Sequence, residues 1–281
     1  MPSKDIPMSQ SLPLYQIDAF TDRVFGGNPA AVCPLNVWLT DEVMQAIALE
    51  NNLSETAYFV ARDDGDFDIR WFTPLTEIDL AGHPTLATAW LILNRLEPSR
   101  QTVRFHSMTG DVLDIARDGD LLVMDFPARP ASPIAVPDGF TEAIGQAPQE
   151  LLRAVKNMAV FGSAEEVLGL DPDMSFIKGL EGFGLICTAP GDDYVDECDF
   201  VSRFFAPHVG IPEDPVTGSA HCTLISYWAS RLCKDKLHAR QVSARGGVSY
   251  SAKMLARVSP SPGGRCSIWK AGSTFDGPPQ R

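Results

Sequence analysis

Short runs of apolar and β-branched residues, bounded by turn-forming Asp, Gly and Pro, recur along the chain and are typical of β-strands. In the first half they predict strands at residues 14–20, 56–61, 67–73, 103–106, 111–117 and 121–126. In the second half they predict strands at residues 160–161, 175–177, 185–188 and 200–205. The pattern therefore indicates a chain of short strands joined by tight turns.

Two longer segments, residues 85–96 and 220–232, are apolar over so much of their circumference that they predict buried helices. Shorter helices are expected at residues 41–50, after the candidate N-cap Thr40, and at residues 149–155. Strands and helices are thus mixed along the chain, which favours an α+β fold.

The two buried helices follow similar Gly-containing turns, one at Gly82 and the other at Gly218. A proline-rich tract at residues 127–133 separates these two halves. We therefore expect two similar domains, residues 1–128 and 129–281. Residues 260–264 interrupt the expected final hairpin, although residues 265–270 can supply a last strand.

Composition and charge narrow the possible partners. The 281 residues include 23 Lys and Arg against 36 Asp and Glu, a net charge of −13, which excludes binding to nucleic acid phosphates or anionic membranes through bulk charge. Six scattered cysteines show no CxxC pair, and neither a signal peptide nor a membrane-spanning run is present, so we expect a cytoplasmic protein. A small molecule is the default partner.

Common cofactor and metal signatures do not occur. The five histidines show no HExxH or HxxxH spacing, and neither GxGxxG nor GxxxxGK[ST] is found. We therefore expect no metal and no cofactor, so any chemistry would rest on side chains alone.

The two Gly-containing turns are candidate anion sites. The first turn of a helix exposes unpaired backbone N–H groups and the positive end of the helix dipole. Either turn alone is explained equally well as the start of a core helix. If the halves face each other, however, both helix N-termini would point at one cleft and could hold a single carboxylate.

Several separated motifs resemble the PhzF-like phenazine biosynthesis family over residues 14–250. They are QIDAF at 16–20, GNPAAV at 27–32, NLSETAYF at 52–59, RWFTP at 70–74, EIDLAGHPT at 77–85 and DPVTGSA at 214–220. The resemblance implies the diaminopimelate-epimerase-like fold, with two similar domains that are each a barrel-like sheet wrapped around a central helix. It also implies an active site between the domains and a homodimer.

The same resemblance assigns roles to individual residues. Glu55 becomes the carboxylate that shuttles a proton, and His83 and Asp214 become its catalytic partners. The implied substrate-binding residues are Asn28, Gly82, Thr217, Gly218 and Ser219. In the epimerases two cysteines face each other across the substrate, whereas the corresponding turns here carry Gly82, His83 and Asp214. Two-thiol racemisation is therefore disfavoured.

Structural alternatives remain open from the residues alone. Glu55 could pair at a strand edge, His83 could be a core or capping histidine, and Asp214 and Asn28 could serve turn geometry. These readings need no substrate.

The function expected from the resemblance is a cofactor-independent isomerase that shifts a proton and a double bond in a small carboxylate-containing substrate. The family's named substrate is a dihydro-hydroxyanthranilate, but a fold does not transfer substrate identity. One alternative is a binding protein without turnover. A weaker one is a hydrolase using Ser219, His83 and Asp214, although no GxSxG elbow surrounds the serine.

Overall fold

β-strands form the framework of the protein. The computed structural model describes residues 11–21, 25–191, 198–243, 249–255, 265–269 and 273–274. Pairing joins all described strands into one 18-stranded mixed sheet. The strands are β1 (Tyr15–Ala19), β2 (Asn28–Leu35), β3 (Glu55–Ala61), β4 (Phe67–Phe72), β5 (Glu77–Ile78), β6 (Thr102–Ser107), β7 (Val112–Asp118), β8 (Leu121–Pro127), β9 (Ser132–Pro133), β10 (Glu150–Arg153), β11 (Asn157–Val160), β12 (Leu185–Pro190), β13 (Phe200–Ala206), β14 (Ile211–Asp214), β15 (Lys236–Gln241), β16 (Ser249–Leu255), β17 (Arg265–Trp269) and β18 (Ser273–Thr274).

Helices fill and cover the curved sheet. They are α1 (Asp41–Asn51), α2 (Gly82–Leu91), α3 (Phe140–Ile144), α4 (Ala164–Leu168), α5 (Met174–Gly179) and α6 (Gly218–Leu232). A π-helical turn, η1 (Ile92–Leu96), continues α2, and a 3-10 turn, η2 (Pro207–Val209), follows β13. Among the described residues, no helix is both long enough and apolar enough to span a membrane.

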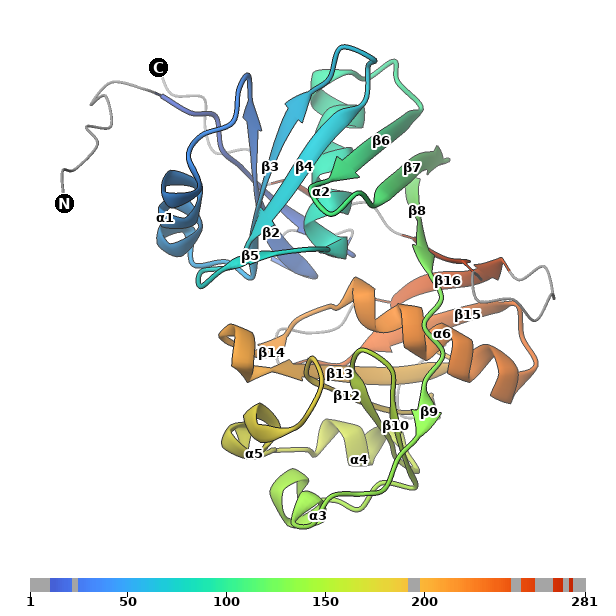
Figure 1. Ribbon diagram of the computed structural model, residues 1–281. Coiled ribbons are helices and arrows are strands. Elements are labelled where there is room, and N and C mark those ends of the chain that lie inside the picture. The colour runs from blue at the N-terminus through green and yellow to red at the C-terminus, as the bar shows by residue number, and fades with distance from the viewer. Residues whose placement is uncertain are drawn as a thin grey trace, which may run out of the picture.

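Two lobes are visible in Figure 1, the upper one with β2 to β8 and α2 and the lower one with β9 to β16 and α6. Every residue of α2 except Trp90 is buried, so this helix lies at the centre of the upper lobe. α6 buries Leu224, Ile225 and Trp228 in the same way. The expected α+β class, with a buried helix in each half, is confirmed.

The largest hydrophobic cluster is continuous between the lobes. It includes Leu86 and Leu91 of α2 together with Leu224, Ile225 and Trp228 of α6. Because both central helices contribute to one core, burial of apolar surface holds the two lobes together.

The last strands of the chain connect back to the first half. β17 pairs antiparallel with β8, with Arg265 opposite Pro127, and β18 pairs with β1. The strand predicted at residues 265–270 is therefore confirmed. The interruption predicted at residues 260–264 lies outside the described residues.

Two predicted elements were wrong. Residues 149–155 contain β10 and not a helix. Its neighbours Leu151 and Leu152 pack into different hydrophobic clusters on opposite faces of the sheet, which removes the polar alternation by which a strand is recognised. Residues 175–177 lie in α5 and not in a strand, because the Asp173 carboxylate caps this helix by accepting hydrogen bonds from the N–H groups of Ser175 and Phe176.

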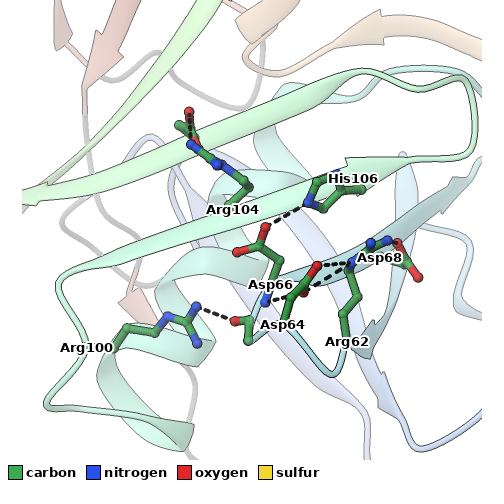
Figure 2. A network of polar contacts seen from close by, with 9 residues as sticks. Arg62, Asp64, Asp66, Asp68, Arg100, Arg104 and His106 are labelled. Atoms are coloured by element: carbon green, nitrogen blue, oxygen red, sulfur yellow. Dashed lines mark hydrogen bonds and ion pairs between the residues drawn. The ribbon is translucent and has the colours of Figure 1, made fainter.

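A polar network fastens the β3–β4 turn to β6, as Figure 2 shows. Arg62 pairs with Asp68 at 2.8 Å, and His106 Nε2 lies 2.8 Å from an Asp66 carboxylate oxygen. These side chains are partly exposed, so solvent screens each pair and its contribution to stability is small. His106 thus pairs with Asp66 in this network and does not line the cavity described below.

Gly27 and Gly119 are two turn glycines with the same positive φ but different surroundings. The φ of Gly27 is +61°, and a Cβ there would lie 2.1 Å from the Ala19 carbonyl oxygen. Gly119 has the same φ but nothing within 4 Å of such a Cβ. We expect Gly27→Ala to lower the free energy of unfolding by about 3 kcal/mol or more, and Gly119→Ala by only about 1 kcal/mol, measured by urea denaturation. Equal losses would show that the contact with Ala19 is unimportant.

Candidate functional site

The N-termini of the two central helices meet at Gly82 and Gly218. A Cβ on Gly82 would lie 3.5 Å from the Gly218 Cα and 3.0 Å from the ring of Phe126. A Cβ on Gly218 would lie 3.2 Å from the ring of Phe20. Because two helix N-termini with exposed N–H groups adjoin each other here, the positive ends of two helix dipoles are concentrated at one place.

A cavity of about 530 Å³ opens beside this junction. Both lobes line it, with β5 from the upper lobe and β14 from the lower lobe in Figure 1. Of the residues predicted from the sequence, the cavity brings together Glu55, Gly82, His83, Asp214, Thr217, Gly218 and Ser219. Asn28 does not line it and lies directly behind it, in contact with His83 and Asp214.

Glu55 begins β3, and its carboxylate faces His83, the second residue of α2. Glu55 Oε2 and His83 Nε2 are 3.3 Å apart, but neither atom makes a hydrogen bond and both are buried. Burial, followed by the nearby Asp214 charge, raises the pKa of Glu55 well above its ordinary value. Burial lowers the pKa of His83 to about 3, so the imidazole is neutral at physiological pH. Glu55 therefore binds a proton more readily than an exposed glutamate does.

Asp214 is fixed by hydrogen bonds, unlike Glu55. Its two carboxylate oxygens accept from Asn28 Nδ2 at 2.7 Å and from the Thr217 hydroxyl at 2.5 Å. Burial raises the pKa of Asp214 to about 6, while these two hydrogen bonds and the charge of Lys156 act in the opposite direction. At neutral pH Asp214 is thus mainly ionised and held in one orientation.

Asn28 connects the two halves of the site. Its amide nitrogen donates to Asp214 and to the Val216 carbonyl at 2.9 Å, and it lies 3.3 Å from His83 Nδ1. The amide has two hydrogens, and the two shorter contacts are to acceptors in the second half. A fully buried amide between the halves therefore fixes the position of Asp214 relative to α2.

Gln241 was missed as a site residue. Its Nε2 donates to the Asp214 carbonyl at 2.6 Å, and its Oε1 accepts from the Thr217 N–H at 2.8 Å. The buried Gln241 side chain therefore braces the turn that precedes α6. No local pattern marks this role, because Gln241 reaches that turn only through the pairing of β13 with β15.

Two cations of the cavity wall, Arg129 and Lys156, were also missed. Lys156 precedes the fully buried strand β11, and a lysine beside such an apolar run was the one available signal. Within the described part of the chain, no group of three or more His, Cys, Asp and Glu side chains is arranged to hold a metal ion.

The hydrolase arrangement is not assembled. Ser219 lines the cavity, yet no hydrogen bond joins it to His83, whose Nε2 faces Glu55. The hydroxyl therefore lacks the base that a serine nucleophile needs. None of the five cysteines with described side chains lines the cavity, which agrees with the disfavoured two-thiol chemistry.

Comparison with solved structures shows which class of proteins shares this fold. A PhzF-family phenazine biosynthesis protein from Enterococcus faecalis has a crystal structure that superposes with a TM-score of 0.86 at 40% identity, covering 95% of this chain and 98% of that one. A hydroxyproline epimerase from Agrobacterium vitis shares the fold alone, with a TM-score of 0.61 at 13% identity over 94% of this chain and 91% of its own. The fold is that of isomerase-like proteins of the PhzF and epimerase type.

The family follows from the sequence match. The model described as phenazine biosynthesis-like protein matches residues 17–266, and the chain belongs to this family. An uncharacterized isomerase of Pseudomonas aeruginosa is 50% identical over 236 residues, which cover 84% of this chain and 89% of that protein. The human phenazine biosynthesis-like domain-containing protein is 38% identical over 265 residues, with coverage of 84% and 90%.

The contact between Asn28 and Asp214 can be tested by placing a second negative charge at position 28. In Asn28→Asp a second carboxylate replaces the donor 2.7 Å from the Asp214 oxygen. Two facing carboxylates raise each other's pKa in the folded protein, so the destabilisation is fully present above those pKa values and decreases as pH falls and a proton binds. We expect a loss of about 3 kcal/mol or more at pH 8 and a smaller loss at pH 5, measured by urea denaturation.

The matched control is Asn94→Asp. The Asn94 side-chain oxygen accepts from Arg117 Nη1 at 3.2 Å, and its nitrogen donates to the Trp90 carbonyl at 2.9 Å. Asn94→Asp loses the second contact but gives Arg117 a charged partner, so the two effects oppose each other. This control should change the free energy of unfolding by less than about 1 kcal/mol. A loss for Asn28→Asp that is the same at both pH values would contradict the proposed pairing with Asp214.

Proposed function

We propose that this protein is a cofactor-independent isomerase that moves a proton, and with it a double bond, within a small carboxylate-containing substrate. The observation that carries the proposal is Glu55, a buried carboxylate with a raised pKa and an oxygen without a hydrogen-bond partner, in the wall of the cavity. Such a group can accept a proton from one carbon and return it to another.

The helix junction supports binding of the substrate carboxylate. Gly82, His83, Gly218 and Ser219 form the first residues of α2 and α6 and line the same cavity. An anion there would face the positive ends of both helix dipoles, and the absence of side chains on the two glycines lets it approach the backbone. The same contact would stabilise negative charge that develops on the carboxylate as the carbon loses its proton.

The two carboxylates have different roles: Glu55 transfers the proton, and Asp214 orients the substrate. Glu55, as carboxylate, takes a proton from a substrate carbon, and the electron pair of that C–H bond moves into the adjacent π system. Glu55 then returns a proton to a different carbon, so the product has the formula of the substrate. Because the Glu55 proton can exchange with solvent before it is returned, the reaction in D₂O places deuterium on that carbon. Asp214 remains ionised because Asn28 and Thr217 hold it, and it orients a polar substituent together with neutral His83.

The second candidate is a binding protein that keeps the cavity without turnover. Specific features favour the enzyme, because a buried carboxylate without a hydrogen bond is unfavourable for stability and gains nothing for simple anion binding. The homodimer, the cytoplasmic location and the domain boundary at residue 128 stay predictions from the sequence.

Replacing Glu55 tests the mechanism. Glu55→Gln preserves the shape of the side chain but cannot carry the proton, so exchange of a carbon-bound hydrogen with D₂O should fall by about 10²–10⁴-fold. The probes are dihydro-hydroxyanthranilate and a panel of β,γ-unsaturated carboxylates, followed by NMR. Binding of the same acids should persist.

The matched control for this test is Glu77→Gln, the same chemical change in the wall of the same cavity. Glu77 is paired with Arg70 and is more exposed, so this variant should exchange hydrogen at the normal rate. Undiminished exchange in Glu55→Gln would refute the assignment, and no exchange by the unaltered protein on any probe would favour the binding protein.

The pH profile of exchange gives an independent prediction. The reaction starts from the Glu55 carboxylate, so the rate should rise with pH and level off above the raised pKa of that group. Asp214 contributes to this elevation, so Asp214→Asn should shift the apparent pKa downward even though it also slows the reaction. Asp79→Asn, which removes an exposed carboxylate from the same cavity, should leave the apparent pKa in place. An unshifted profile in Asp214→Asn would contradict the coupling.

A further inference from the structure

Two positively charged side chains in the cavity wall form no ion pair with the described carboxylates, although the Asp214 charge acts on one of them, Lys156. Lys156 and Arg129 both line the cavity from the second half, and neither side chain makes an ion pair or hydrogen bond with any described residue. By contrast, two arginines of the same half form ion pairs, Arg203 with Glu213 and Arg153 with Glu181. Neither cation takes part in the proton transfer proposed above.

Lys156 is unusual because of its burial. The residue is only 6% exposed, and lysines are almost never buried to this extent unless paired. Its ammonium group lies 5.4 Å from the ring centroid of Phe183 and 5.6 Å from that of Phe204, two rings that also line the cavity. The ring faces offset part of the desolvation of the cation but provide no countercharge.

Arg129 adds a second charge at the same wall. Its backbone N–H donates to the Cys222 carbonyl of α6 at 2.8 Å, which fixes this residue against the central helix. Burial, with a smaller contribution from the Arg129 charge, lowers the pKa of Lys156 to about 8, while Cys222 and Asp214 oppose the change. Lys156 thus remains mainly an ammonium at neutral pH. The two like charges stand close together, and Asp214 acts on Lys156 without forming an ion pair with it.

The charges around the rest of the cavity wall indicate where an anion would bind. Glu77, Asp79 and Asp111 line the cavity from the first half, and they would repel an anionic group. The helix N-termini at Gly82 and Gly218 provide one positive region, and Lys156 with Arg129 provides another. A substrate with a single carboxylate would leave one of these two regions without a countercharge.

We propose that Lys156 and Arg129 bind a second anionic group of the substrate, so that the enzyme acts on a dianion with one carboxylate at the helix N-termini and a second carboxylate or a phosphate at these two cations. This inference rests on the proposed function, since it names the substrate class of the same site. The planar guanidinium of Arg129 matches either oxyanion, and Lys156 supplies a point charge.

Chain-length series of simple acids test the proposal. Each dicarboxylate from malonate to adipate is compared with the monocarboxylate of equal carbon number, by calorimetric titration at constant ionic strength. Phosphonoacetate and 3-phosphonopropionate form a second arm that distinguishes phosphate-like from carboxylate recognition. We expect at least one dianion to bind about tenfold or more tightly than its matched monoanion, and the best length reports the separation of the two positive regions.

Variants assign the preference to the two cations. Lys156→Met keeps the length of the side chain and removes an unpaired buried charge, so the fold should be retained with an equal or higher melting temperature. This variant and Arg129→Met should each reduce the preference for the dianion to within about twofold and leave monoanion affinity unchanged. Lys236→Met, which removes an exposed lysine of β15 and changes net charge equally, should keep the full preference.

The outcomes separate this inference from the proposed function. No preference for any dianion in the unaltered protein, or a preference that survives in Lys156→Met, overturns the inference while Glu55-dependent exchange can still stand. Dianion preference without any Glu55-dependent exchange supports the cation pair and refutes the isomerase. Trapping of a carbonyl probe on Lys156 by borohydride would also overturn the inference, because it would assign a nucleophilic role to that amine.

Discussion

The close approach of Gly82 and Gly218 is the constraint on which the rest of the site depends. Two helices from different halves of the chain begin within a van der Waals contact of one another, and the rings of Phe126 and Phe20 fill the space that any side chain there would need. This contact brings His83 into the same cavity as Asp214 and Ser219. It also gathers the exposed N–H groups of two helices, an arrangement that is electrostatically unfavourable until negative charge is present. The contact that packs the two helix N-termini together therefore also concentrates positive potential at the cavity.

The two buried carboxylates differ because their surroundings differ. Asp214 accepts hydrogen bonds from Asn28 and Thr217, and Gln241 braces the backbone around it. Glu55 faces a neutral imidazole without a hydrogen bond, so its charge is stabilised by nothing fixed. Asp214 is therefore mainly ionised at neutral pH, whereas Glu55 binds a proton more readily than an ordinary glutamate does. Environments that separate the proton affinities of neighbouring acids in this way are typical of enzymes that combine acid and base chemistry.

Sequence patterns predicted those parts of the protein whose chemistry is local. The Gly-containing turns, both buried helices and most strands were found because turn residues and apolar periods act over a few positions. Residues 149–155 were assigned wrongly because packing on both faces of β10 removes the alternating pattern. Gln241 and Lys156 could not be placed, since their surroundings come from strands and rings that are distant in the sequence. The proximity of Glu55 to Asp214 likewise depends on how the halves pack, and the sequence supported it only through family resemblance.

The pairing of β17 with β8 and of β18 with β1 has a consequence for folding. Strands near the end of the chain complete the sheet of the first half, so this half presents unpaired strand edges until those residues have been synthesised. Contacts of such large sequence separation raise the contact order and slow the search for the native topology. The sheet of the first half is therefore completed only after β17 and β18 have been made, and until then its unpaired edges expose the nascent chain to aggregation.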